Sequence, residues 1–137
     1  MLTGLNHITI AVNNLDRSLS FYTERLGLKP YVRWDKGAYL SLGDIWFCLS
    51  CDKAKPSQDY SHIAFSIAAA DFDTMCVKLR ALNIVEWQQN HSEGCSLYIL
   101  DPDGHKLEIH CGSLASRLAY LKTHPLKGIR WFKTPDG

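Results

Sequence analysis

The spacing of apolar and polar residues predicts the same order of elements in both halves of the chain. Residues 5–12 are rich in β-branched side chains and predict a strand, and residues 15–26 have apolar side chains at helical spacing. Gly27 then provides a helix stop. Three short strands follow, separated by polar turns: residues 29–34, 38–42 and 45–50. The first half is therefore a βαβββ module.

The second half repeats this order. A strand at residues 60–67 is followed by a helix at about 70–82 and by strands near 84–88, 95–100 and 106–110. The pair His62-Ile63 occupies the place of His7-Ile8, which suggests a duplication. We expect one α+β domain over residues 1–137, made of module one (about 1–52), module two (about 59–112) and a C-terminal helix (about 113–122) that Ser113 caps.

Composition excludes several classes of protein. With 137 residues, 46% hydrophobic content and a net charge of +1, the chain can bury a core and lacks the basic surface that nucleic acid requires. The N-terminus has no basic segment followed by an apolar one, and no stretch is apolar enough for a bilayer, so we expect a cytoplasmic protein without a membrane partner. Five cysteines without framework spacing favour reduced thiols.

Two histidines and a glutamate are the candidate metal ligands. Because side chains alternate along strands, His7, His62 and Glu108 could meet on inner faces of the sheet, and three ligands leave a divalent metal open to substrate. The alternative is that the histidines are hydrogen-bonded core residues and the glutamate is solvated. If the halves align from Gly43 onto Gly104, Phe47 takes the place of Glu108 and supplies no fourth ligand.

Residues 90–98 form a second candidate site. This loop carries hydroxyl, carbonyl and carboxylate oxygens, and Ser96 and Tyr98 share a strand face, so it could hold a monovalent cation or an anionic group, or be only a polar hairpin. Residues 100–105 predict a turn and no more. Four strand aromatics could wall a cavity or belong to the core: Trp34, Tyr39, Trp46 and Tyr60.

Several segments together resemble a known family. They are residues 5–9, 37–41, 60–62, 92–94 and 100–110, and with Tyr39, Tyr98 and Arg117 they are similar to the glutathione-transferase type of fosfomycin resistance protein, within the vicinal oxygen chelate superfamily. The resemblance extends from Met1 to about Arg130. It implies two βαβββ modules in a cup-shaped mixed sheet, and a strand-exchanged homodimer in which His7 of one chain joins His62 and Glu108 of the other around Mn²⁺.

The resemblance also implies roles for other residues. Thr9 would hydrogen-bond the epoxide oxygen of fosfomycin while the thiol of glutathione attacks carbon, a step that needs no protein nucleophile. A potassium ion would lie among Asn90, Ser92, Glu93, Gly94 and Ser96. The drug would be held by Tyr39, Trp46, Tyr60, Ser92, Ser96, Tyr98 and Arg117, and the thiol by Trp34, Ser50, Gln88 and His91.

The chain departs from the family pattern at the thiol entrance. Gln88 stands where a lysine is usual, His91 where a basic residue is usual, and Leu126 replaces a usual tyrosine, so we expect weaker binding of anionic substrates. Three alternatives stay open: a relative that uses another thiol, a relative that adds water, and a metal-free antibiotic-binding module. A water-adding enzyme would need a general-base carboxylate, for which Asp44 is the nearest candidate in sequence.

Overall fold

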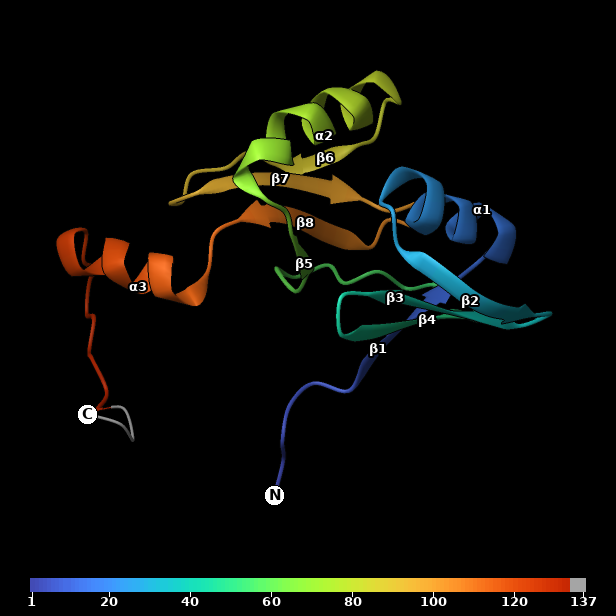
Figure 1. Ribbon diagram of the computed structural model, residues 1–137, viewed down its shortest axis with the longest axis horizontal. Coiled ribbons are helices and arrows are strands. Elements are labelled where there is room, and N and C mark those ends of the chain that lie inside the picture. Colours follow the sequence, from blue (N-terminus) through green and yellow to red (C-terminus); the bar gives the residue numbers. More distant parts are fainter. Residues whose placement is uncertain (134–137) are drawn as a thin grey trace.

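The computed structural model describes residues 1–133 and contains two four-stranded sheets, one from each half of the chain (Figure 1). The α+β class and the two βαβββ modules are thereby confirmed; residues 134–137 of the expected domain lie outside the described residues. The first half contains β1 (His7–Val12), α1 (Leu15–Ser20), the π-helical turn η1 (Phe21–Arg25), β2 (Lys29–Trp34), β3 (Gly37–Leu42) and β4 (Ile45–Cys51). The second half contains β5 (Ile63–Ser66), α2 (Ala69–Ala81), β6 (Glu86–Gln88), β7 (Cys95–Leu100), β8 (Lys106–Cys111) and α3 (Leu114–Thr123).

Both sheets have the same topology. The first sheet has the order β1-β4-β3-β2 and the second β5-β8-β7-β6. β1 runs parallel to β4 and β5 runs parallel to β8, and the other neighbouring pairs are antiparallel. A parallel pair needs a long crossover, and the helix of each module lies within it, α1 in the first and α2 in the second. In Figure 1, α3 leaves the end of β8 and extends away from both sheets, and none of its residues is buried.

A single apolar core joins the two modules. Tyr22 and Phe47 of the first module are fully buried, and the Phe47 ring packs 6.0 Å from the ring of Phe65 on β5. Leu79 of α2 and Ile99 of β7 belong to the same buried cluster. Among the described residues no helix has the length and apolar character that crossing a membrane requires.

The strand register corrects the expected alignment of the halves. Ile8 pairs with Phe47 in the first sheet as Ile63 pairs with Leu107 in the second, so Phe47 corresponds to a core leucine. Cys48, opposite Thr9, is the residue that corresponds to Glu108. The alignment from Gly43 onto Gly104 was wrong by one residue, and because strand side chains alternate, that single step moves Phe47 from the site face to the core.

The helix expected at residues 15–26 changes type midway. The α-helix ends at Ser20 and continues as the π-turn η1, which Gly27, with a φ of 83°, terminates. The Lys78 ammonium of α2 donates to the carbonyls of Glu24 and Arg25 at 3.3 and 3.0 Å. This contact satisfies backbone acceptors at the end of η1 and ties the helices of the two modules together.

The turn between β7 and β8 locks the modules together, a role that its composition alone did not indicate. The buried carboxylate of Asp101 accepts hydrogen bonds from the Tyr22 hydroxyl at 2.7 Å and from the backbone N–H groups of Asp103 and His105 at 2.9 Å each. The neighbouring Asp103 carboxylate accepts from Arg17 and Ser18 of α1, and His105 bonds the carbonyl of Ala11 in β1. Tyr22 remains a donor, because burial and the facing Asp101 carboxylate raise its pKa far above the ordinary value.

Replacing Tyr22→Phe should lower the free energy of unfolding by about 1–3 kcal/mol, because a buried carboxylate loses a donor while the ring still fills its space. Urea denaturation of the purified protein measures this. The matched control is Tyr31→Phe on the exposed strand β2, where the Tyr31 hydroxyl accepts from Ser41, and its change should stay within about 0.5 kcal/mol. Equal losses in the two variants would contradict the locking role of Asp101.

Candidate functional site

His7 and Thr9 stand on the outer face of the first sheet beside a cavity of about 300 Å³. Both side chains are exposed, since alternation along β1 sends Ile8 and Ile10 towards the core instead. The cavity brings together six of the expected site residues, from the metal, drug and thiol groups: His7, Thr9, Trp34, Tyr39, Trp46 and Ser50. Cys48 and Lys36 complete the polar part of its lining.

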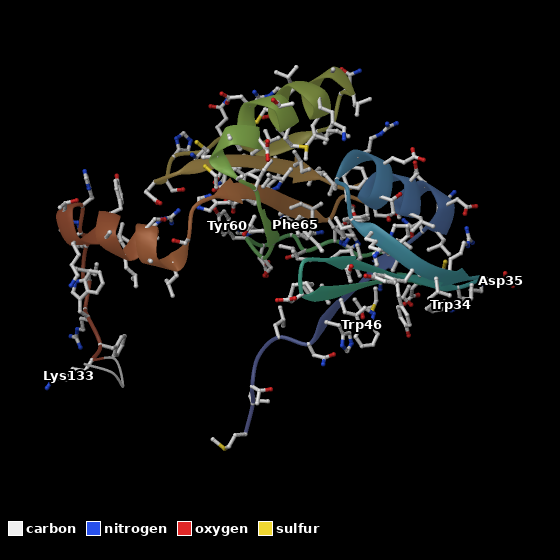
Figure 2. The ribbon with its side chains drawn as sticks, in the orientation of Figure 1. Trp34, Asp35, Trp46, Tyr60, Phe65 and Lys133 are labelled. Carbon is white, nitrogen blue, oxygen red and sulfur yellow. The ribbon has the colours of Figure 1, made fainter. Side chains whose placement is uncertain are left out.

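Aromatic rings form one wall of this cavity. Trp46 packs against the His7 imidazole with ring centroids 4.4 Å apart, and Tyr39 stands edge-on between Trp46 and Trp34 at 5.1 and 4.8 Å. Figure 2 shows Trp34 and Trp46 on the same side of the first sheet. Gly37 permits the arrangement, because a Cβ there would come within 2.6 Å of the Trp34 ring.

The other two expected metal ligands meet on the second sheet. His62 lies just before β5, Glu108 lies on β8, and the parallel pairing of these strands brings His62 Nε2 to 3.0 Å from Glu108 Oε1. The backbone carbonyl of Tyr60 lies 2.7 Å from His62 Nδ1. The turn before His62 is fixed by Asp59, whose hydrogen bonds from Ser57 and Ser61 lower its pKa to about 2.

The hydrogen bonds determine which nitrogen of each histidine is free. A carbonyl only accepts, so His62 Nδ1 donates to Tyr60, and Nε2 is the nitrogen that faces the Glu108 carboxylate. Nε2 and Oε1 lie 3.0 Å apart: a proton on Nε2 makes this a hydrogen bond, and without that proton the two atoms are ligands that a cation can join. His7 has the same arrangement, since Nδ1 lies 2.7 Å from Asn6 Oδ1 and Nε2 is left free. The donor set therefore fits a divalent metal.

Glu108 is also held by a polar chain that the sequence left unassigned. The Ser96 hydroxyl lies 2.7 Å from Glu108 Oε2 and 2.6 Å from His110 Nδ1. A hydroxyl has one proton, so it donates to the carboxylate and accepts from His110 Nδ1–H. His110 thus orients Ser96, and Ser96 orients Glu108. Alternation along β8 had placed Glu108 and His110 on one face, which was the only signal in the sequence.

Trp87 is a site residue that the sequence analysis missed. Its ring stands edge-on to His62, Tyr98 and Tyr60 at centroid distances of 5.5, 5.1 and 5.7 Å, and its indole N–H donates to the carbonyl of Leu107 at 2.9 Å. It therefore supports His62 through its ring and the backbone next to Glu108 through its N–H. A bulge in β6 between Glu86 and Gln88 makes such a position hard to predict from alternation.

The loop before β7 closes on itself and on α3. Asn90 donates to the Gly94 carbonyl at 2.8 Å and accepts from the N–H of Ser92. Arg117 of α3 donates to the carbonyl of Glu93 at 3.1 Å and reaches the Ser92 hydroxyl at 3.4 Å. Glu93 Oε2 and Arg117 Nε are buried 3.6 Å apart without a hydrogen-bond partner among the described residues. The structure thus brings the expected loop residues together with Arg117.

The expected thiol residues divide between the two sheets. Trp34 and Ser50 lie in the first-sheet cavity, whereas Gln88 on β6 donates to the Tyr60 hydroxyl at 2.9 Å and His91 is exposed in the loop. Lys36, in the turn between β2 and β3, is a cation in the first-sheet cavity that no sequence signal identified. Figure 2 shows Trp46 on the first sheet and Tyr60 apart from it, in the segment that leads into β5.

One chain does not bring His7 to His62 and Glu108. Within residues 1–133, the one group of three His, Cys, Asp or Glu side chains with ligand atoms within 4.8 Å of one another is Asp101, Asp103 and His105. Their hydrogen bonds to Tyr22, Arg17, Ser18 and Ala11 already occupy these side chains in joining the modules, so we assign the group a structural role. The metal candidates form two half-sites: His7 is exposed on the first sheet, whereas on the second sheet His62 is half-buried and Glu108 is buried.

Comparison with known proteins identifies the family to which this fold belongs. Residues 4–109 match the model of the Glyoxalase/Bleomycin resistance protein/Dioxygenase superfamily, and the chain belongs to that superfamily. Within it, the chain is 50% identical over 134 residues to glutathione transferase FosA of Serratia marcescens, a match that covers 94% of this chain and 95% of the relative. It is 40% identical to metallothiol transferase FosB of Shouchella clausii, covering 91% and 92% of the two chains.

Solved structures show the same fold. The fosfomycin resistance protein FosX of Listeria monocytogenes, in a monoclinic form at pH 6.5, superposes with a TM-score of 0.79 at 29% identity and covers 88% of this chain and 99% of that one. A structure of the same protein complexed with Mn(II) and sulfate has a TM-score of 0.77 at 26% identity, covering 86% and 99%. The expected membership in the fosfomycin resistance group is confirmed.

The hydrogen-bond chain from His110 through Ser96 to Glu108 predicts different stabilities for the variants His110→Asn and His110→Gln. His110→Asn keeps an N–H donor near the place of Nδ1 and should stay within about 0.5 kcal/mol of the parent in free energy of unfolding. His110→Gln places its donor farther out and should lose about 1 kcal/mol, the value of one hydrogen bond. Denaturant titration measures both. Indistinguishable midpoints would show that His110 does not donate to Ser96.

Proposed function

We propose that this protein is a metal-dependent glutathione transferase that adds the thiol of glutathione to the epoxide of fosfomycin and thereby inactivates the antibiotic. The observation that carries the proposal is the pairing of two groups that can ligate a metal, His62 Nε2 and Glu108 Oε1, 3.0 Å apart. The 50% identical relative is a glutathione transferase, which supports the choice of thiol. Mn²⁺ is our choice of metal, since nitrogen and carboxylate ligands suit it and a FosX structure holds Mn(II).

The ligands would be His62 and Glu108 of one chain and His7 of a second chain. A bound divalent ion supplies Lewis acidity, which stabilises the negative charge that develops on the epoxide oxygen. Thr9, two residues from His7 on the same face of β1, would donate a hydrogen bond to that oxygen. In the balanced reaction the sulfur–carbon bond forms, the carbon–oxygen bond breaks, and the oxygen takes a proton to become a hydroxyl.

The loop at residues 90–96 would hold the charged end of the drug. Its buried Glu93 Oε2 has no hydrogen-bond partner among the described residues and is an acceptor suited to a potassium ion beside the Arg117 guanidinium, and the backbone carbonyls and hydroxyls around it are oxygen ligands. Arg117, Ser96 and Tyr98 would bind the phosphonate, with Tyr39, Trp46 and Tyr60 around the rest of the drug. Ser92 belongs to both sets, because Arg117 already reaches its hydroxyl.

The first-sheet cavity favours a thiol over water as the attacking group. The residues that line it include no carboxylate, so among the described residues it offers no general base for water. Asp44, the candidate from the sequence, lines a different cavity with Tyr31 and Ile45. Lys36, Trp34 and Ser50 would instead receive the carboxylate and peptide groups of glutathione.

Purified protein with fosfomycin, glutathione and Mn²⁺ should form the thiol adduct, detected by phosphorus NMR. Glu108→Gln keeps the shape of the ligand but removes its charge, and should lower kcat/KM by at least about 100-fold, the upper end of what changes around a metal site cause. Removing the metal with a chelator should abolish turnover, and returning Mn²⁺ should restore it.

Parallel reactions separate the alternatives. Faster addition of a different thiol, such as bacillithiol, would place the protein with the metallothiol relatives, and a diol product would make it a hydrolase. Drug binding without turnover or metal dependence would make it a binding module. Adduct formation that survives both the chelator and Glu108→Gln would disprove the proposed site.

We also propose a strand-exchanged homodimer, because His7 is exposed and does not reach His62 and Glu108 of its own chain, and because no residue of α3 is buried. Mixing His7→Ala with His62→Ala chains in equal amounts should restore activity, since each mixed dimer has one site with all its ligands. Random pairing makes about half of the dimers mixed, so about a quarter of the parent activity is expected. Mixing His62→Ala with Glu108→Gln is the control: both changes fall in one half-site, so activity there would argue against exchange.

Gln88→Lys tests the proposed shortage of positive charge at the thiol entrance. Gln88 bonds Tyr60 beside the second half-site, so a lysine there adds a cation close to the anionic substrates. We expect KM for glutathione or fosfomycin to fall by up to about tenfold, or 1.4 kcal/mol, with little change in kcat. Gln89→Lys, at the neighbouring exposed position, controls for net charge. An unchanged KM in both variants would remove Gln88 as the cause of weak binding.

A further inference from the structure

Two cysteines face each other on neighbouring strands outside the candidate site. Cys95 opens β7, Cys111 ends β8, and the two are direct partners in the antiparallel register. Cys95 is exposed and Cys111 is half-buried. They point to the face opposite Ser96 and His110, the next pair in the register, and therefore lie on the side of the sheet that carries Asp73 and Cys76 of α2.

The register places these thiols within reach of a covalent bond. Directly opposed residues of an antiparallel pair have Cα atoms roughly 4.5 or 5.5 Å apart, and both values fall in the range of about 4.4–6.8 Å that disulfides require. The Cys111 thiol is the largest cause of the raised pKa of Cys95, which agrees with two side chains that project from the same face at paired positions. Each cysteine is flanked by a glycine with positive φ, Gly94 at 82° and Gly112 at 151°, so the backbone on either side has no Cβ to resist adjustment.

We propose that Cys95 and Cys111 are a redox-active dithiol that closes to an intrachain disulfide by exchange with glutathione disulfide, the oxidised form of the proposed co-substrate. The Cys95 thiolate attacks one sulfur of glutathione disulfide, forming a mixed disulfide and releasing one glutathione. The Cys111 thiolate then attacks the Cys95 sulfur, forming the protein disulfide and releasing the second glutathione. Two protein thiols are oxidised, one glutathione disulfide is reduced, and the protons pass to solvent and to the leaving thiolates.

Protonation of the thiols determines the conditions under which exchange is fast. An ordinary cysteine thiol has a pKa of about 8.5 and is mainly protonated at neutral pH, and only the thiolate attacks a disulfide. Exchange should therefore quicken as pH rises. Cys95 lies between Gly94 and Ser96, so the closed bond ties the end of the proposed potassium loop to β8.

The test incubates the full-length protein with glutathione disulfide at about pH 8.5, near the ordinary thiol pKa, and digests it with trypsin without reduction. Lys106 lies between the two cysteines, and the peptides 81–106 and 107–117 contain one cysteine each, so only a disulfide keeps them together. We expect this linked pair, two hydrogen atoms lighter than the sum of its peptides, and a fall in free thiols from the five of the chain to three.

Variants and labelling identify the bond. Cys95→Ser and Cys111→Ser should each abolish the linked peptides, whereas Cys51→Ser, at a half-buried cysteine near the Asp35 carbonyl, should leave them unchanged. Mixing unlabelled with ¹⁵N-labelled protein should give no hybrid pair. A hybrid pair, a link from Cys95 to Cys76, or a glutathione adduct on Cys95 as the final product would overturn the proposal. None of these measurements requires activity, so a failure of the proposed enzyme function would be seen separately.

Discussion

The parallel pairing of the first and last strand of each module is the constraint on which the site depends. It brings residues far apart in sequence side by side: Ala64 opposite Glu108 in the second sheet, and Thr9 opposite Cys48 in the first. His62 therefore stands beside Glu108, 46 positions away. A hairpin could not do this, because adjacent strands joined by a short turn run antiparallel, and the crossover helices α1 and α2 are what make the parallel pairs possible.

The two half-sites share a plan but differ in chemistry. At corresponding positions of the duplicated modules stand His7 and His62, Thr9 and Ala64, and Cys48 and Glu108. Only the second module has a carboxylate supported by a polar chain, from His110 through Ser96. The first module instead has the hydroxyl of Thr9 and an aromatic wall around His7. The supported carboxylate and the Thr9 hydroxyl therefore belong to different modules, one in each half-site.

Within a chain, buried polar contacts fix one module against the other. The carboxylate of Asp101 receives three hydrogen bonds, one of them from Tyr22 in the other module, and Lys78 binds the end of η1 across the same boundary. A buried carboxylate restricts how the two modules can be arranged, because losing a hydrogen-bond donor leaves it desolvated without compensation from the apolar core. These contacts hold the two half-sites of one chain apart.

The sequence by itself determined the elements, the duplication and the face on which Glu108 and His110 lie, because period and turn chemistry are local properties. The boundaries predicted from the sequence for β2 and β7 agree with those of the structure. The sequence predicted a continuous α-helix where the structure has the π-turn η1, a segment in which Tyr22 bonds Asp101 and the end of which is bound by Lys78. Only the tertiary structure showed that Trp87 and Lys36 line the half-sites and that Cys48, one residue from the expected Phe47, faces Thr9. Strand register and bulges depend on partners distant in the chain, so no local pattern specifies them.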